Sequence, residues 1–365
     1  MNGDKSVDKY EYWFANIKGI SGNKKREIRQ GMKAAEELYY IEERALKTYH
    51  LAEKEIGIIL DSIRVWKLDE EYQKMLEKGV NCVTVMDSNY PKRLKNICSV
   101  PYAIYWKGQM PKEEKMTVAI VGARDCSAYG ECMAREFAEA LSLADVQIVS
   151  GMANGVDSAG QKGAMMCGGK SFGVLGCGVD ICYPREQISL YVQLQECGGI
   201  LSEFPVGTKP LPQHFPARNR IISGLSDVVL VMEAKERSGS LITADMALEQ
   251  GKDVYALPGP VNSSLSKGCN ALIKQGANVL ISPEMLLDEM GILTKKYKES
   301  DWNKKILLET SENIVYSCLC FQPQNIETIL SATKFSVEEL IDTLVALELK
   351  GLIKEISKNN YVKIR

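Results

Sequence analysis

The fold is decided by the stretch Thr117-Val118-Ala119-Ile120-Val121-Gly122-Ala123-Arg124, an apolar run that ends in a glycine turn. Similar short apolar runs recur at residues 146–149, 172–175, 228–231 and 254–257. Unbroken apolar runs, rather than alternating ones, are typical of parallel strands covered on both faces. Helical patterns lie between them, at residues 130–143, 156–166, 241–250 and 268–275. This alternation predicts an α/β domain with an extended Rossmann-like, doubly wound, mostly parallel sheet.

A small helical domain is predicted before this sheet, at residues 1–75, and the α/β domain itself at residues 76–296. The helical domain contains the turn Gly19-Ile20-Ser21-Gly22, followed by the basic stretch Lys24-Lys25-Arg26. Two helices joined by such a turn form a helical hairpin. It either grips a DNA backbone through the amides of its turn or serves only for packing.

Residues 303–365 form the last predicted domain, with helical patterns at 312–320, 325–332 and 336–350 and two strands around Lys358-Asn359-Asn360. Three helices followed by a β hairpin predict a winged helix. The third helix carries Glu338, Glu339, Asp342 and Glu348 against Lys350 alone. Because such a surface repels phosphates, we expect this domain to contact protein, or simply to pack, rather than to bind DNA.

Composition limits the kinds of partner. The net charge of the 365 residues is −2, so any nucleic-acid site has to be a local patch. The 11 cysteines are scattered without a CxxC pair, which favours reduced thiols in the cytoplasm over a disulfide framework or a zinc site. The charged N-terminus does not resemble a signal peptide, and no apolar run is long enough to span a membrane. We therefore expect a soluble cytoplasmic protein.

The most informative stretch for function is Phe215-Pro216-Ala217-Arg218-Asn219-Arg220. It lies in residues 204–226, which contain four prolines but no Asp or Glu. The prolines are expected to hold the segment extended. An aromatic ring beside two arginines can stack a base and pair with a phosphate. The alternative is a surface loop with two unrelated arginines.

Glycine-rich turns follow several of the predicted strands. They contain Gly122 and Arg124 ahead of Ser127, then Gly151 in Ser150-Gly151-Met152-Ala153-Asn154-Gly155-Val156-Asp157, and Ser238, Gly239, Ser240 and Thr243 at a helix start. A helix start offers free amides to a phosphate. Together with Lys267 and three acid-free stretches (158–179, 204–226 and 254–283), these turns suit a repeated phosphate better than one small ligand. Otherwise they are only the tight turns of a parallel sheet.

Catalysis is not indicated. There is no dinucleotide or Walker sequence and no metal-ligand cluster, and we expect no cofactor. Glu203 and Glu233 could act as acid or base, but both can equally cap a helix or pair with an arginine.

Taken together, these motifs resemble the DprA/Smf family of bacterial DNA-processing proteins. The resemblance rests on Tyr90-Pro91-x-x-Leu94, Val121-Gly122-Ala123-Arg124, Ser150-Gly151-Met152-Ala153-x-Gly155-Val156-Asp157, Gly176-Cys177-Gly178-Val179-Asp180, Tyr183-Pro184, Leu201-Ser202-Glu203, the Phe215–Ile222 segment, Ser238-Gly239-Ser240-Leu241-Ile242-Thr243-Ala244, Pro258-Gly259 and Gly268-Cys269-Asn270. They occur in family order over about 200 residues. The family usually has Ala-His where this chain has Gly160-Gln161.

The resemblance implies a dimeric, non-enzymatic protein that binds single-stranded DNA, protects it, and helps to load a RecA-type recombinase during natural transformation. It further implies that Phe215 stacks a base and that Arg218 and Arg220 either pair with phosphates or support the pocket. We therefore expect DNA contacts from Gly122, Arg124, Ser127, Gly151, Lys170, Phe215, Arg218, Asn219, Arg220, Ser238, Gly239, Ser240, Thr243 and Lys267.

Two other functions fit the sequence less well. A phosphoribohydrolase-like enzyme of a related Rossmann variant needs a Pro-Gly-Gly-x-Gly-Thr stretch, where this chain reads Pro258-Gly259-Pro260-Val261-Asn262. A transcription regulator acting through the winged helix is disfavoured by the acidic third helix. The single-strand DNA binder is the favoured hypothesis.

Overall fold

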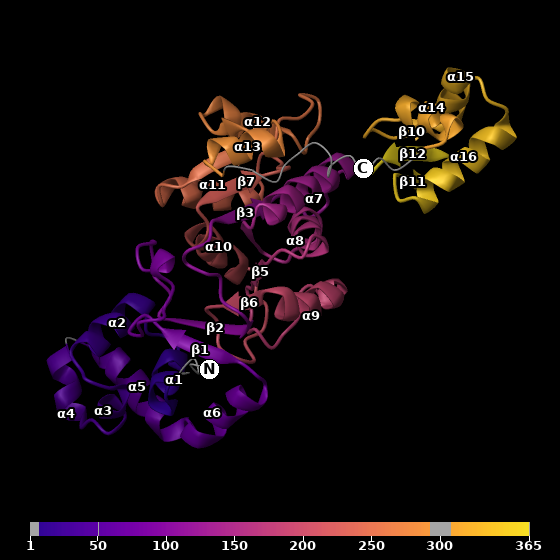
Figure 1. Cartoon of the computed structure of the whole chain (residues 1–365). Helices are drawn as coiled ribbons and strands as arrows, with labels where there is room; N and C mark the ends of the chain where they lie inside the picture. Colours follow the sequence, from indigo (N-terminus) through magenta and orange to yellow (C-terminus); the bar gives the residue numbers. More distant parts are fainter. Residues whose placement is uncertain (1–6, 50, 293–307, 365) are drawn as a thin grey trace.

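A nine-stranded sheet forms the centre of the molecule in the computed structural model, which describes residues 7–49, 51–292 and 308–364 (Figure 1). The spatial order is β1 (Asn81–Thr84), β2 (Ala103–Gly108), β6 (Gly199–Ser202), β5 (Ser171–Val174), β4 (Gln147–Ser150), β3 (Thr117–Val121), β7 (Val228–Val231), β8 (Asp253–Ala256) and β9 (Asn278–Val279). From β6 to β9 in this spatial order, each strand runs parallel to its neighbours. By contrast, β2 pairs antiparallel with both β1 and β6. The predicted Rossmann-like, mostly parallel sheet is confirmed.

The helices of this domain cover both faces of the sheet. They are α7 (Ala128–Leu143), α8 (Val156–Met166), α9 (Ile188–Cys197), α10 (His214–Leu225), α11 (Gly239–Glu249), α12 (Lys267–Lys274) and α13 (Pro283–Glu289). Val118 and Ile120 of β3 pack in one hydrophobic cluster with α7, α8 and α13, whereas Ala119 and Val121 pack in another with α10, α11 and α12. Because successive side chains of a strand point to opposite faces, an unbroken apolar strand fills both cores.

The sequence at residues 81–85 predicts β1, but three strands of the nine-stranded sheet were not predicted, namely β2, β6 and β9. The β6 strand begins in a Gly-Gly pair, which resembles a turn in the sequence. A Cβ added at Gly198 would lie 1.8 Å from Ser171 O, and one at Gly199 would lie 2.0 Å from Gln109 O. The glycines are therefore needed where neighbouring backbones approach closely, and they do not end the strand.

The N-terminal helices are α1 (Lys9–Asn16), α2 (Gly22–Gln30), α3 (Ala35–Tyr39), α4 (Glu43–Leu46), α5 (Glu53–Val65) and α6 (Leu68–Glu77). They pack against the antiparallel end of the sheet. The ring of Tyr12 lies 6.2 Å from that of Tyr105, and the ring of Phe14 lies 5.4 Å from that of Tyr102. One hydrophobic cluster is consequently continuous from these helices into the sheet.

The basic stretch Lys24-Lys25-Arg26, near the start of α2, is only partly at the surface. Lys25 is buried and its Nζ donates a hydrogen bond to Ala15 O at 2.6 Å. Lys24 pairs with Glu27, with 3.0 Å between Nζ and Oε2. Two of the three basic residues therefore have structural partners.

The C-terminal elements are α14 (Thr310–Cys318), β10 (Gln324–Asn325), α15 (Ile326–Thr333), α16 (Val337–Leu349), β11 (Ile353–Ser357) and β12 (Asn360–Lys363), and β10 was not predicted. The strands form a separate antiparallel sheet in the order β10-β12-β11. These elements enclose their own hydrophobic cluster. They contact the larger domain through Phe321, whose ring lies 5.7 Å from that of Tyr129 on α7.

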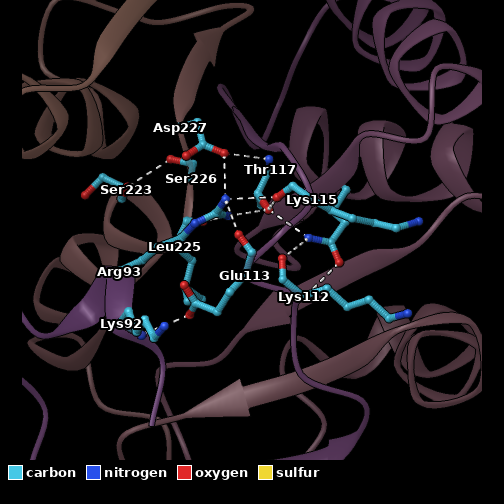
Figure 2. Close-up of polar contacts among 11 residues, drawn as sticks. Lys92, Arg93, Lys112, Glu113, Lys115, Thr117, Ser223, Leu225, Ser226 and Asp227 are labelled. Carbon is cyan, nitrogen blue, oxygen red and sulfur yellow. Dashed lines mark hydrogen bonds and ion pairs between the residues drawn. The ribbon is translucent and has the colours of Figure 1, made fainter. Parts of the chain in front are cut away.

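Figure 2 shows a polar network around Arg93 at the amino end of β3. The Arg93 guanidinium pairs with Asp227 at 3.0 Å and donates to Thr117 Oγ1 at 2.7 Å and to Leu225 O at 3.0 Å. Thr117 begins β3, and Leu225 is the last residue of α10. The network therefore fixes the end of α10 relative to the sheet.

Candidate functional site

A cavity of about 500 Å³ opens at the carboxyl ends of β3, β4 and β7. Strands β4 to β6 continue the sheet on one side of β3, and β7 to β9 continue it on the other, so the strand order reverses beside this cavity. Ligands of open α/β sheets bind at such a reversal. Of the predicted contact residues, the cavity is lined by Gly122, Arg124, Phe215, Arg218, Asn219, Ser238, Gly239, Ser240 and Thr243.

The segment around Phe215 is helical, and our expectation that it is extended was wrong. Helix α10 spans His214–Leu225, with Pro216 as its third residue. A proline is tolerated in the first turn of a helix because the amide it lacks would have no intrahelical acceptor there. The other prolines of the acid-free stretch, at 205, 210 and 212, precede the helix. The helix therefore places Phe215, Arg218 and Asn219 along one wall of the cavity.

Two aromatic rings form part of that wall. The Phe215 ring lies 5.3 Å from the ring of Tyr183 at an angle of 33°. The Arg124 guanidinium carbon lies 5.8 Å from the centre of the Phe215 ring. A Cβ at Gly176 would lie 2.9 Å from Phe215 Cδ1, so a glycine is needed behind the ring. Because Phe215 is half-buried and 41% of Tyr183 is exposed, both rings are accessible to a planar ligand.

The positive charge of the site comes from exposed residues on two loops. Arg124 follows β3, and Lys235 and Arg237 lie between β7 and α11. All three side chains line the cavity, and none takes part in an ion pair among the residues that the structure describes. One exposed carboxylate, Asp125, also lines it. The mouth of the cavity is therefore positive overall.

The start of α11 adds a second source of positive potential. Ser238 caps this helix, and its Oγ accepts a hydrogen bond from Ser240 N at 3.4 Å. Asn219 Nδ2 donates to Gly239 O at 3.1 Å, which ties α10 to this helix start. The amino end of a helix carries partial positive charge and unpaired amides. The site can therefore bind an anion beside an aromatic surface.

Arg218 lines the cavity but is held by contacts within the protein. It is 5% exposed, and its guanidinium donates to Val174 O. Its charge interacts with the buried Asp157, which accepts a hydrogen bond from Gly151 N at 3.0 Å. Burial raises the pKa of Asp157 and lowers that of Arg218 to about 10. Arg218 and Asp157 thus order the glycine-rich turn after β4.

Arg220 lies outside the cavity and has acceptors within the protein. Its Nη1 and Nη2 donate to the two carboxylate oxygens of Glu203, each at 2.6 Å, and its Nε donates to Ser99 O at 2.9 Å. Both arginines therefore have contacts within the protein that suit structural support, one of the two roles expected for Arg218 and Arg220. Glu203 has the ion-pair role that the sequence allowed.

Four more predicted residues also lie outside the cavity lining. Ser127 caps α7, and its Oγ donates to Glu233 Oε1 at 2.6 Å, which gives Glu233 a structural role. Gly151 packs against Arg218, since a Cβ there would be 2.2 Å from Arg218 Nη2. Lys170 directly precedes β5 and is therefore at the opposite end of the sheet. Lys267 is the first residue of α12, and its Nζ lies 4.0 Å from Glu236 Oε1.

Sequence reasoning did not select Tyr183, Lys235 or Arg237 as site residues. Lys235 and Arg237 follow the carboxyl end of β7, and that position was the available signal. For Tyr183 the signal was weaker, because its approach to Phe215 depends on how the loop folds. Gln161, one of the two residues at which the sequence departs from the resemblance noted above, is buried in α8 and donates to Phe172 O at 3.0 Å. It does not line the cavity.

Two kinds of feature are absent from the residues that the structure describes. No group of three or more His, Cys, Asp or Glu side chains is arranged to hold a metal ion. No helix among these residues is long and apolar enough to cross a membrane.

Comparison with known proteins gives consistent matches. The family model for DNA recombination-mediator protein A matches residues 81–291. Protein Smf of Escherichia coli is 38% identical over 292 residues, which are 76% of this chain and 75% of that protein. The DNA processing protein DprA of Streptococcus pneumoniae is 40% identical over 222 residues, covering 61% of this chain and 77% of that protein.

Solved structures agree in fold. The X-ray structure of DprA from Streptococcus pneumoniae matches with a TM-score of 0.69 at 32% identity, over 78% of this chain and 99% of that one. DNA processing protein A from Helicobacter pylori, whose structure concerns its single-stranded DNA binding mode, matches with a TM-score of 0.54 at 29% identity. That match covers 58% of this chain and 95% of the other.

Proposed function

Because the chain belongs to the DprA/Smf family of DNA recombination-mediator proteins, we propose that it binds single-stranded DNA in the cavity beside α10. One observation carries the proposal. The paired rings of Phe215 and Tyr183 lie at the same cavity as Arg124, Lys235 and Arg237. Every base has a face that stacks on an aromatic ring, and every nucleotide has a phosphate that attracts a cation, so this pairing suits a single strand of any sequence.

In the proposed complex, an unpaired base stacks on Phe215 and Tyr183. The phosphates beside it contact Arg124, Lys235 and Arg237, and one phosphate accepts hydrogen bonds from the amides at the start of α11. Arg218 and Asp157 hold the wall of the site without touching DNA. This arrangement favours binding over catalysis, because Glu203 and Glu233 are both engaged in structural hydrogen bonds.

The finer parts of the proposal concern what happens to the bound strand. We propose that the protein acts as a homodimer, protects incoming DNA during natural transformation and helps to load a RecA-type recombinase. A protein that holds the strand by stacking on base faces and by contacting phosphates does not use the hydrogen-bonding edges of the bases. Those edges stay free for a recombinase. Sedimentation of the free protein and a strand-exchange assay with recombinase and single-strand binding protein test these parts separately from DNA binding.

The test of DNA binding is fluorescence anisotropy with labelled poly-dT at two salt concentrations. We expect tight binding by the wild type, weakened by salt. Phe215→Ala should lose roughly 1–3 kcal/mol of binding free energy from stacking. Arg124→Ala should reduce the slope of log affinity against log salt by about 0.7 for the phosphate contact that it removes.

Lys170→Ala is the matched control, because this lysine lies at the other end of the sheet. Its affinity should equal that of the wild type. Wild-type affinity in the Arg124→Ala/Phe215→Ala double variant would place the DNA elsewhere, and no binding at low salt would refute the proposal altogether.

A further inference from the structure

Helix α16 has two apolar faces, although a helix at the surface of a small domain needs only one. The inner face carries Leu340, Leu344 and Leu347, which are fully buried in the C-terminal core. The outer face carries the stripe Val337, Ile341, Val345 and Leu349, with exposed fractions of 58%, 44%, 51% and 85%. These four residues are spaced by four positions and therefore line one side of the helix. Figure 1 shows α16 at the edge of the C-terminal elements, away from the nine-stranded sheet.

The stripe is bordered by negative charge. Glu338, Asp342 and Glu348 lie on α16 beside it, and all three are exposed. Lys350, the basic residue at the end of the helix, does not offset them, because its Nζ pairs with Glu312 at 2.6 Å. The residues 308–364 contain eight carboxylates against five lysines. The apolar stripe is thus set in an acidic surface.

These charges restrict what can cover the stripe. A DNA duplex is disfavoured, because its phosphates would meet the carboxylates. The same stripe of a second copy is also disfavoured, because Glu338, Asp342 and Glu348 of both copies would face one another across a dry interface. The remaining occupant has apolar residues for the stripe and positive charges for its borders.

We propose that the outer face of α16 is a docking surface for a basic amphipathic helix of a partner protein. The leucine-like side chains of that helix would pack on Val337, Ile341, Val345 and Leu349, and its lysines or arginines would pair with Glu338 and Asp342. A helix that lays an apolar stripe on a complementary surface is a common mode of peptide recognition. This interaction is separate from the proposed DNA site, which lies in the other domain.

The test uses the full-length protein and two labelled helical peptides of about 18 residues, roughly five turns. Both carry leucines along one face. Lysines flank this face in the basic peptide, and glutamates replace them in the acidic one. We expect the wild type to bind the basic peptide with micromolar affinity, and the acidic peptide at least about tenfold more weakly.

Two variants separate the apolar contribution from the charge contribution. Ile341→Ser/Val345→Ser should weaken binding of the basic peptide at least about tenfold. Glu338→Lys/Asp342→Lys should shift the preference to the acidic peptide. Val65→Ser is the matched control, because Val65 is 80% exposed on another helix, α5, and this variant should bind like the wild type. Circular dichroism checks that all variants keep their helices.

Several results would overturn the proposal. These are equal affinity of the wild type for both peptides, no binding of either, and full binding by the Ile341→Ser/Val345→Ser variant. Sedimentation showing that wild type self-associates and this variant does not would assign the stripe to a second copy. Loss of duplex DNA binding in this variant would assign it to nucleic acid. Poly-dT binding should be unchanged in every variant, which distinguishes this test from that of the DNA cavity.

Discussion

Replacing Arg218 by methionine tests whether this arginine is a structural support or a phosphate partner. The side chain is 5% exposed and its guanidinium donates to Val174 O. Its charge also interacts with Asp157, which is buried with 7% of its surface exposed. Methionine keeps most of the volume but leaves Asp157 without this opposite charge.

The expected loss follows from that burial. Removing one member of a buried charge pair costs roughly 3–5 kcal/mol of folding free energy, because the other charge stays buried without compensation. Replacing both members by neutral residues of similar volume is often close to neutral. Because Asp157 keeps its hydrogen bonds from Gly151 N and Ala153 N, we expect Arg218→Met to lower the free energy of unfolding by at most about 3–5 kcal/mol, and Arg218→Met/Asp157→Asn to restore a large part of the loss.

The pH dependence gives the prediction a sign. Burial raises the pKa of the Asp157 carboxyl above its ordinary value, and Arg218 opposes that rise. Without Arg218 the pKa in the folded state should rise further. A carboxyl whose pKa is raised on folding destabilises the protein only above the pKa of the unfolded chain, about 4, and the penalty grows until the folded-state pKa is passed. The loss in Arg218→Met should therefore be smaller at pH 5 than at pH 7.

Urea unfolding at pH 7 and pH 5, followed by circular dichroism, measures these differences. The double variant should show no extra pH dependence from position 157, and it serves as the control. The reasoning would be refuted if Arg218→Met kept wild-type stability yet lost DNA binding, because Arg218 would then contact phosphate directly. It would also be refuted if Asp157→Asn failed to compensate for the loss.

Three further predictions concern the backbone, a buried lysine and the network of Figure 2. Gly155 has a φ of +75°, and a Cβ there would lie 2.3 Å from Arg124 O, so Gly155→Ala should destabilise the protein and weaken poly-dT binding. Its control is Gly168→Ala, with a φ of +73° but open space, which should leave binding intact; equal binding losses would contradict this. Burial lowers the pKa of Lys25 to about 7, so the free energy of unfolding should rise between pH 7 and about 10, by at most about 1.4 kcal/mol per pH unit. Urea unfolding across that range should show a shallower rise in Lys25→Met, and an unchanged slope would argue against a lowered pKa of Lys25. Arg93→Met should lower the free energy of unfolding by several kcal/mol, which calorimetry can measure. A loss below about 1 kcal/mol would show that the network of Figure 2 does not fix the position of α10.

The parallel sheet was predictable because its strands are local, unbroken apolar runs. The strands at 117–121 and 228–231 coincide with the predicted runs, and three others agree to within one residue at each end. By contrast, β6 was missed, since the close backbone approach at Gly198 and Gly199 depends on strands distant in sequence. Proline content misled us about α10 for a similar reason. Position within the first turn decides whether Pro216 is compatible with a helix, and composition does not reveal position.

The site shows the same division. Residues in turns after strands, such as Gly122, Arg124 and Ser238, were predicted to converge because carboxyl ends of parallel strands meet at one edge. What composition could not decide was which arginines are occupied. The acid-free stretch 204–226 suggested that its positive charges have no ion-pair partners. Arg220, however, pairs with Glu203, the residue directly before that stretch. The partners of a side chain depend on tertiary packing.

The hydrophobic cluster shared by the N-terminal helices and the sheet has a consequence for how the chain can be divided. Tyr12 and Phe14 cover Tyr105 and Tyr102, which belong to β2 or directly precede it. A chain trimmed to the segment 81–291 would leave this aromatic surface in water. Units that evolution can recombine as modules need not melt separately. Here we expect the helices and the sheet to unfold in a single cooperative step. The start of the family match at residue 81 would then not separate two independently folding units.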